Sequence, residues 1–159
     1  NPLPTGKVGI LWIAGDNVMQ GYYNAPDLTQ QVLHNGWLNT GDLASLDGRG
    51  VITIVGRSKD LIINKGFNIY PQEVENVLLR HPAVFKAAVV AKDEEGDQVP
   101  VAYVALREGA AVSESDISTF CRNNLAAYKV PRAITCMTDL PMTATGKVDK
   151  QTLRKNQRA

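Results

Sequence analysis

The stretch GRSKDLIINKGFNIYPQEVE, residues 56–75, decides the fold of this chain. It opens with a charged turn at 57–60 and continues as two short apolar runs around the Asn-Lys-Gly sequence at 64–66. Two such runs around a glycine-containing turn predict a β-hairpin, and Gly66 is where a positive φ or a close ligand costs least. Pro71 predicts the start of a helix, because its fixed φ and missing N–H suit a first helical position. The residues alone fit a plain surface hairpin equally well.

Strand and helix patterns alternate outside this stretch, which favours an open sheet covered by helices. Before it, strands are expected at 7–14 and 51–56, and a short helix from residue 24 is expected to end at Asn35-Gly36. After it we expect three helices and three strands: helix 71–80, strand 85–92, an acidic turn at 93–97, strand 99–107, a helix from Ser113 with Asp116 in a capping box, a strand within 126–137, and a basic helix over 149–155. Residues 1–56 hold too few apolar side chains to bury a core alone, so we interpret them as a piece of a larger domain.

The composition is that of an ordinary globular protein, with 44% apolar residues. Seventeen basic and 16 acidic residues give a net charge of +1, which does not favour nucleic acid or an anionic membrane as a partner. Cys121 and Cys136 have no paired spacing, so a reducing, cytoplasmic location is expected. No apolar run reaches the roughly 20 residues of a membrane span, and no metal site is expected. No signal peptide is visible, but Asn1 looks like an internal residue, so this says little about the parent protein.

Three motifs in order carry a family resemblance. The stretch at 56–75 closely resembles the hinge-and-hairpin motif of the adenylate-forming superfamily, which includes acyl- and aryl-CoA synthetases, adenylation domains of nonribosomal peptide synthetases, and firefly luciferase. NTGDLASLDGRG at 39–50 and LPMTATGKVDK at 140–150 fit the same family. The resemblance covers essentially the whole chain, but only the end of the family's full length.

The resemblance implies an α+β fold in three parts. Residues 1–56 would be the C-terminal, β-rich strip of the large domain, and 57–60 would be the hinge. Residues 61–159 would be the small mobile domain, with a β-hairpin and a three-stranded sheet covered by helices. Within the family, the sequence looks most like medium- and long-chain fatty acyl-CoA synthetases.

Two residues of the first part are candidates for holding ATP or AMP. The carboxylate of Asp42, which we expect directly after a small turn in Thr-Gly-Asp at 40–42, can accept two hydrogen bonds from a ribose diol. The planar guanidinium of Arg57 suits a ribose oxygen or a phosphate. Without the resemblance, a solvated aspartate and a strand-end arginine would explain both positions; with it, both are expected to contact the nucleotide.

Three residues of the central stretch take roles from the resemblance. Lys59 stands at the family's hinge, where a residue absorbs a large change in φ and ψ without touching substrate. Lys65 and Gly66 form the turn that would meet the pantetheine arm of coenzyme A in the second half-reaction. Luciferases carry a functional lysine at the position of Ile63, so this departure favours a thioester-forming ligase.

Lys147, in the small-residue loop 143–147, is the expected adenylation catalyst. When a carboxylate attacks the α-phosphate of ATP, two anions repel each other and negative charge builds up in the transition state. A long ammonium side chain that contacts both groups lowers that repulsion. From composition alone, Lys147 would be a solvated loop lysine; the resemblance makes it the residue that carries the chemistry.

Lys129 and Arg132, in YKVPR at 128–132, resemble the family segment near the 3′-phosphate and adenine of coenzyme A. The expected function is therefore the C-terminal fragment of an ATP- and Mg²⁺-dependent acyl-CoA synthetase, with a carboxylic acid, in particular a fatty acid, as substrate. The fragment alone would be inactive without its missing N-terminal domain. The alternatives are an adenylation domain that loads a pantetheinyl carrier protein, and a stand-alone small-molecule binding module. A short reading frame that starts near Asn1 would favour the last alternative, whereas a frame that extends far upstream with a phosphate-loop sequence would favour the ligase.

Overall fold

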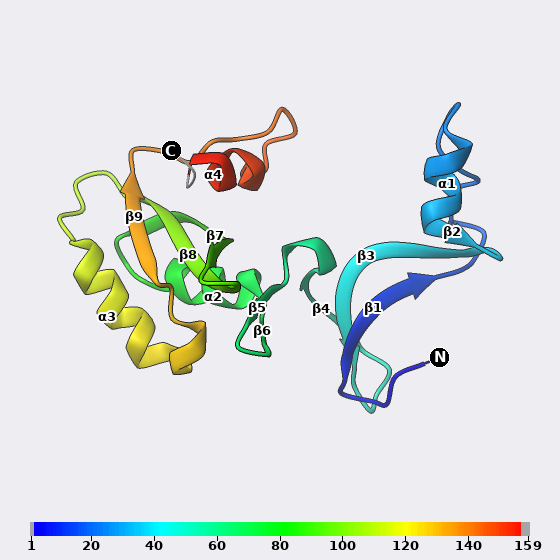
Figure 1. Ribbon diagram of the computed structural model, residues 1–159, viewed down its shortest axis with the longest axis horizontal. Coiled ribbons are helices and arrows are strands. Elements are labelled where there is room, and N and C mark those ends of the chain that lie inside the picture. Colours follow the sequence, from blue (N-terminus) through cyan, green and yellow to red (C-terminus); the bar gives the residue numbers. More distant parts are fainter. Residues whose placement is uncertain (1, 157–159) are drawn as a thin grey trace. The chain divides into compact units, whose positions relative to one another are not determined.

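The computed structural model describes residues 2–156, which fall into two compact units, the first ending at Lys59 and the second beginning at Asp60 (Figure 1). The first unit contains β1(Val8–Ile13), α1(Pro26–Val32), β2(Leu33–His34), β3(Trp37–Leu46) and β4(Ile52–Arg57). The short 3-10 helix η1(Ser58–Asp60) lies at the boundary. The second unit contains β5(Ile62–Asn64), β6(Phe67–Ile69), α2(Pro71–Leu79), β7(Val84–Glu94), β8(Asp97–Leu106), α3(Glu114–Asn124), η2(Ala127–Lys129), β9(Ala133–Met137) and α4(Lys150–Asn156).

The first unit is an antiparallel sheet built around the long strand β3, which pairs with β1, β2 and β4. The pairing register shifts between Ile10 and Trp12 and between Leu43 and Ala44, and such bulges bend the strands, as the curved ribbons of β1 and β3 show (Figure 1). Leu43 and Ala44 are its buried apolar residues within 2–59. This confirms the expectation that the segment buries little core of its own.

Two expectations for this unit were wrong in detail. Asn35 and Gly36 do not close a helix: both have positive φ, 49° and 81°, and they form a hairpin turn between β2 and β3. Asp42 does not follow a turn either. It lies inside β3, which runs through Gly41 despite that residue's φ of 71°, and it pairs with Arg57 of β4.

The predicted hairpin of the second unit is confirmed. β5 and β6 pair antiparallel, and Lys65 and Gly66 between them have φ of 47° and 80°, which is the pattern of a type I′ turn. Ile62 and Ile69 face each other across the ladder and are fully buried. Pro71 begins α2 immediately after the hairpin, as predicted.

The three-stranded sheet of this unit has the order β7–β8–β9. β7 and β8 are antiparallel and β9 runs parallel to β8, with α3 in the connection. The acidic turn expected at 93–97 is shorter, because the strands continue to Glu94 and resume at Asp97. Only Glu95 and Gly96 form the turn, with φ of 53° and 82°.

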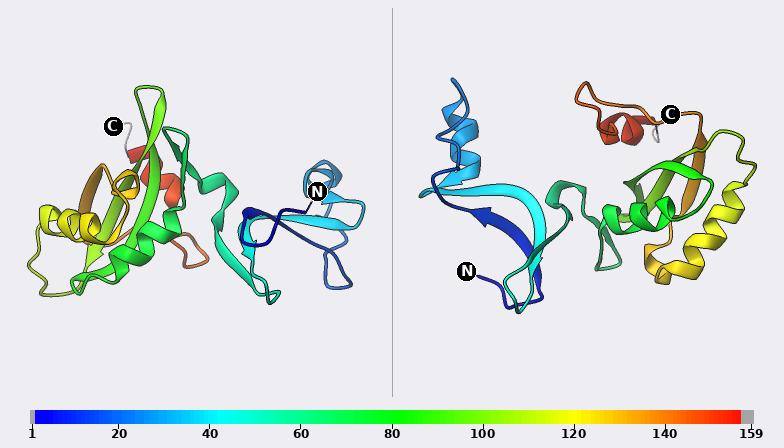
Figure 2. Two further views of the ribbon diagram at one scale, coloured as in Figure 1. Left: turned by 90° about the horizontal axis from the view of Figure 1, so that it is seen from below. Right: turned by 180° about the vertical axis from the view of Figure 1, so that it is seen from behind.

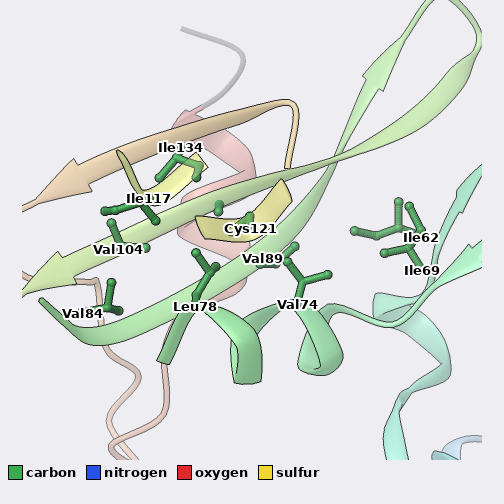
Figure 3. Close-up of a cluster of buried hydrophobic side chains, with 11 residues drawn as sticks. Ile62, Ile69, Val74, Leu78, Val84, Val89, Val104, Ile117, Cys121 and Ile134 are labelled. Atoms are coloured by element: carbon green, nitrogen blue, oxygen red, sulfur yellow. The ribbon is translucent and has the colours of Figure 1, made fainter. Parts of the chain in front are cut away.

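Helices cover both faces of this sheet, which confirms the α+β prediction, and Figure 2 (left) shows α3 and α4 on opposite sides of it. On one face, α2 and α3 bury Val74, Leu78, Ile117 and Cys121 against the sheet, together with the two isoleucines of the hairpin (Figure 3). The predicted Ser113–Asp116 capping box starts α3. On the other face, Leu153 of α4 is fully buried with Val90 and Leu140. The hairpin, α2 and α3 therefore share one core.

Both cysteines are free thiols. Cys121 is fully buried in the α3 face of the core, and burial raises the pKa of its thiol to about 11. Burial, followed by the nearby charge of Glu114, also raises the pKa of Cys136 in β9. Neither sulfur is therefore a ready nucleophile at neutral pH.

Two adjacent leucines of α2 test this core. Leu78 is fully buried and Leu79 is 44% exposed. Leu78→Ala should lower the free energy of unfolding by about 3 kcal/mol, because it removes buried apolar surface and leaves a cavity. Leu79→Ala should change it by less than about 1 kcal/mol. Urea unfolding followed by circular dichroism measures both, and equal effects of the two substitutions would contradict the packing.

Candidate functional site

In the first unit, the β3–β4 ladder places Asp42 and Arg57 side by side. The Nε of Arg57 lies 2.8 Å from Oδ1 of Asp42, and its Nη1 donates to the carbonyl oxygen of Thr40 at 3.1 Å. Asp42 is largely buried, whereas half of the Arg57 side chain is exposed. Oδ2 of Asp42 accepts no hydrogen bond among residues 2–156, so one oxygen of a fixed carboxylate stays available for a hydroxyl donor. This arrangement fits a ribose diol.

In the second unit, the turn of the β5–β6 hairpin presents Lys65 and Gly66 to solvent. The backbone N–H of Lys65 donates to Oδ2 of Asp97 at 2.7 Å. The ammonium group of Lys65 has no hydrogen bond or ion pair among residues 2–156. A Cβ added at Gly66 would meet no atom within 4 Å. The turn therefore has open space in front of its backbone.

An open groove of about 590 Å³ runs beside this turn. It is lined by the hairpin turn, the β7–β8 turn, the start of β8 and the segment around η2. Phe67 and Tyr128 stack next to it, with ring centroids 4.8 Å apart and planes at 28°. The aromatic pair thus joins the hairpin to the η2 segment at the edge of the groove.

The two cations of the η2 segment are placed differently. Lys129 is mostly buried, and its Nζ donates to both carboxylate oxygens of Glu73, at 2.6 and 2.8 Å. Burial disfavours its ammonium form, but the hydrogen bond and the charge of Glu73 prevail and raise the pKa of Lys129. Arg132 is 68% exposed, lines the groove and lies 3.4 Å from Glu94. Arg132 is therefore the more accessible anion ligand of the two.

Lys147 lies at the end of an exposed loop that is closed like a small hairpin. Thr143 donates its N–H to the carbonyl oxygen of Lys147 at 2.7 Å, and its hydroxyl oxygen accepts the N–H of Lys147 at 3.1 Å. Gly146 has a φ of 78°, and Met142 pairs with Val148 at the base of the loop. Among residues 2–156, the Nζ of Lys147 has no hydrogen bond or ion pair. The main chain of this lysine is fixed while its ammonium group stays free.

The base of this loop is tied to the body of the second unit. The carboxylate of Asp149 accepts hydrogen bonds from the backbone and hydroxyl of Thr152 and from the backbone N–H of Gln151, and so caps α4. These hydrogen bonds, those from Thr152 first, hold the pKa of Asp149 below its usual value. Lys150 pairs with Glu75 of α2 at 2.7 Å. The loop that carries Lys147 is thus followed directly by a helix that is held in place by a cap and an ion pair.

Lys59 is exposed and lies in η1, one residue before the second unit begins. Single 3-10 turns are common connectors between elements, so the position of Lys59 in η1 is compatible with a hinge. The structure brings Asp42 together with Arg57, and Lys65 together with Arg132 around the groove. It does not bring Lys147 to the groove. Sequence reasoning missed Glu73 and Asp97 as partners of Lys129 and Lys65, because no local pattern links residues more than 30 positions apart.

Comparison with known proteins shows the family. Residues 73–147 match the family described as AMP-binding enzyme C-terminal domain. A long-chain-fatty-acid–CoA ligase of Escherichia coli O6:H1 is 38% identical over 154 residues, which cover 97% of this chain and 28% of that protein. A 2-succinylbenzoate–CoA ligase of Bacillus mycoides is 44% identical over 154 residues, covering 96% of this chain and 32% of that protein. The chain thus spans about a third of the length of these relatives.

Solved structures agree. The amide bond synthetase of Marinactinospora thermotolerans superposes with a TM-score of 0.89 at 35% identity, over 98% of this chain and 32% of that one. The O-succinylbenzoate coenzyme A synthetase of Bacillus subtilis, in complex with AMP, gives 0.87 at 38% identity, over 99% and 31%. A small α+β unit with these neighbours is the C-terminal domain of an adenylate-forming enzyme. The chain belongs to the adenylate-forming superfamily and carries its C-terminal portion.

Within residues 2–156, no helix is both long and apolar enough to cross a bilayer.

Proposed function

We propose that this chain is the C-terminal part of an ATP-dependent acyl-CoA synthetase, which converts a carboxylic acid, ATP and coenzyme A to acyl-CoA, AMP and pyrophosphate through an acyl-adenylate. The observation that carries the proposal is that one compact unit presents two separate lysine-bearing turns, at Lys65 and Lys147, and neither ammonium group has a partner among residues 2–156. Two half-reactions need two different sets of groups at one site. A domain that pivots near Lys59 would supply them in turn.

In the first half-reaction, Lys147 would stabilise negative charge. The ammonium group would contact the attacking carboxylate and the α-phosphate, which lowers their repulsion and stabilises the transition state. The closed 143–147 loop supports this role, because a fixed main chain positions the side chain at little entropic cost. Mg²⁺ would neutralise phosphate charge in the full-length enzyme; a relative's structure contains ATP and magnesium.

The nucleotide would be held in part by the first unit. The free Oδ2 of Asp42 would accept a ribose hydroxyl, and Arg57, which already fixes the carboxylate, would donate its remaining N–H groups to a ribose or phosphate oxygen. The Asp42–Arg57 pair has little net charge, so it can lie near phosphates without repelling them. The rest of the ATP site would belong to the N-terminal domain.

In the second half-reaction, the groove beside Gly66 would receive coenzyme A. The pantetheine arm would pass the open backbone at Gly66, while Lys65 and Arg132 would face the phosphates. Lys129 would join them only by exchanging Glu73 for a phosphate, because its charge is already matched. The stacked Phe67 and Tyr128 offer an aromatic surface for adenine.

The identity of the acid is a finer question. Long-chain-fatty-acid–CoA ligases are 38–39% identical to this chain, but ligases for 2-succinylbenzoate and sulfoacetate are 42–44% identical. A fatty acid therefore remains one proposal among several carboxylic acids. We also propose a cytoplasmic location, which the two unpaired cysteines support.

Titration of coenzyme A into the full-length parent enzyme tests the acceptor. We expect saturable binding that weakens about tenfold in Arg132→Ala, through loss of a charge-assisted hydrogen bond. Arg122→Ala is the matched control, because Arg122 lies on α3 and bonds only to Thr119 within the described residues. Absent binding would favour the alternative in which the acceptor is a carrier-protein pantetheine. Equal affinity in all three proteins would show that Arg132 does not hold coenzyme A.

A further inference from the structure

Two neighbouring residues of β8, Asp97 and Gln98, bond to three successive residues of the hairpin. Oε1 of Gln98 accepts the N–H of Ile63 at 3.1 Å, its carbonyl oxygen accepts from the side-chain amide of Asn64 at 2.6 Å, and Oδ2 of Asp97 accepts the N–H of Lys65 at 2.7 Å. We propose that Asp97 and Gln98 are positioning residues, which hold the Lys65–Gly66 turn in the geometry that thioester formation requires. The inference rests on the proposed function.

The hairpin needs such support. Its strands have three residues each, and an isolated two-stranded hairpin is marginal in water. Ile62 and Ile69 anchor its base in the core, but the turn itself is exposed. Lys65 also takes a left-handed φ of 47°, which a residue with a Cβ disfavours. Without an external bond, the tip would sample other conformations.

Asp97 is suited to fix this strained residue. Its Oδ1 accepts the N–H of Gln98 at 2.8 Å, which sets the orientation of the carboxylate, while Oδ2 is aimed at Lys65. Asp97 begins β8 directly after the tight Glu95–Gly96 turn, so its own main chain is also held by the sheet. The carboxylate therefore fixes the hairpin turn relative to the three-stranded sheet.

Gln98 completes the contact on the open edge of the hairpin. The N–H of Ile63 points away from β6 and would otherwise face solvent, and β5 and β8 belong to separate sheets. Side-chain and backbone oxygens of one residue thus replace the missing strand ladder. The hairpin and the β7–β8 turn would then approach the reaction site as one rigid body, with the groove between them already shaped.

The test uses the full-length parent enzyme with Asp97→Ala, Asp97→Asn and Asp93→Ala. Asp97→Ala should lower kcat of thioester formation from supplied acyl-adenylate about tenfold and leave acyl-adenylate formation unchanged. Asp97→Asn should restore part of the rate, because its single amide oxygen can still accept the N–H of Lys65, whereas its NH2 group cannot accept the N–H of Gln98. Asp93→Ala removes the same charge from an exposed position in the neighbouring strand and should match the wild type.

Amide hydrogen exchange at Lys65 gives a readout that does not depend on catalysis. Exchange should accelerate in Asp97→Ala and accelerate less in Asp97→Asn. If Asp97→Ala does not fold, Gln98→Ala serves instead, with accelerated exchange at Ile63. Equal loss of both half-reactions, or no rescue by asparagine, would overturn the inference. A wild-type enzyme that forms no thioester would overturn the proposed function instead, and the exchange rates would still report on the positioning contact.

Discussion

Replacing Lys147 with alanine in the full-length parent enzyme should reduce acyl-adenylate formation by at least about a hundredfold. The substitution removes the ammonium group that would balance the charge of the transition state. The loop should keep its shape, because the hydrogen bonds that close it use Thr143 and the main chain of residue 147. Pyrophosphate release in the presence of acid and ATP measures this step.

The same variant should form thioester normally from supplied acyl-adenylate. Lys92→Ala is the control for loss of one positive charge, since Lys92 is an exposed residue of β7 outside the groove and the loop; both of its half-reactions should match the wild type. If Lys147→Ala slows the two half-reactions equally, Lys147 does not act in adenylation alone and the two-turn mechanism fails.

Gly66→Leu should have the opposite effect on the two half-reactions. A leucine at this turn would fill the open space in front of the backbone and block the approach of a pantetheine arm, so thioester formation should fall about a hundredfold. Acyl-adenylate formation should be retained. Because no atom lies within 4 Å of the added Cβ, the cost to folding is limited to the left-handed backbone, about 1–2 kcal/mol.

Gly109→Leu controls for that backbone strain. Gly109 also has a left-handed φ, 75°, and open space around its Cα, but it lies in the loop between β8 and α3, outside the groove. Half-reaction assays on both variants, with thermal midpoints for folding, separate blocking from destabilisation. Thioester formation at the wild-type rate in Gly66→Leu would show that the acceptor does not pass this turn.

Local sequence signals predicted most of the second unit. Gly66 between two apolar runs predicted the hairpin, Pro71 the start of α2, and Ser113 with Asp116 the start of α3. Each signal acts within a few residues, so it can be read without knowing the rest of the chain. The candidate residues Asp42, Arg57 and Lys147 came from the family resemblance, because their surroundings alone are ordinary.

Features that depend on distant partners were not predictable. The acidic run at 93–97 lowers strand propensity, yet the β7–β8 ladder extends through Glu94 because pairing outweighs local preference. The Asn35-Gly36 turn was assigned to a helix end because the same two residues serve both roles. The pairing of Lys129 with Glu73, 56 positions away, had no signal in the sequence.

The chemistry of the two native thiols has a practical consequence for observing the proposed pivot. With a pKa of about 11, Cys121 is a thiolate in only about one molecule in ten thousand at pH 7, and it is shielded from reagents by the core. Burial also raises the pKa of the Cys136 thiol. Maleimide dyes would therefore react first with a cysteine introduced at an exposed site, so fluorescence energy transfer between two such labels can follow domain rotation without removing either native cysteine.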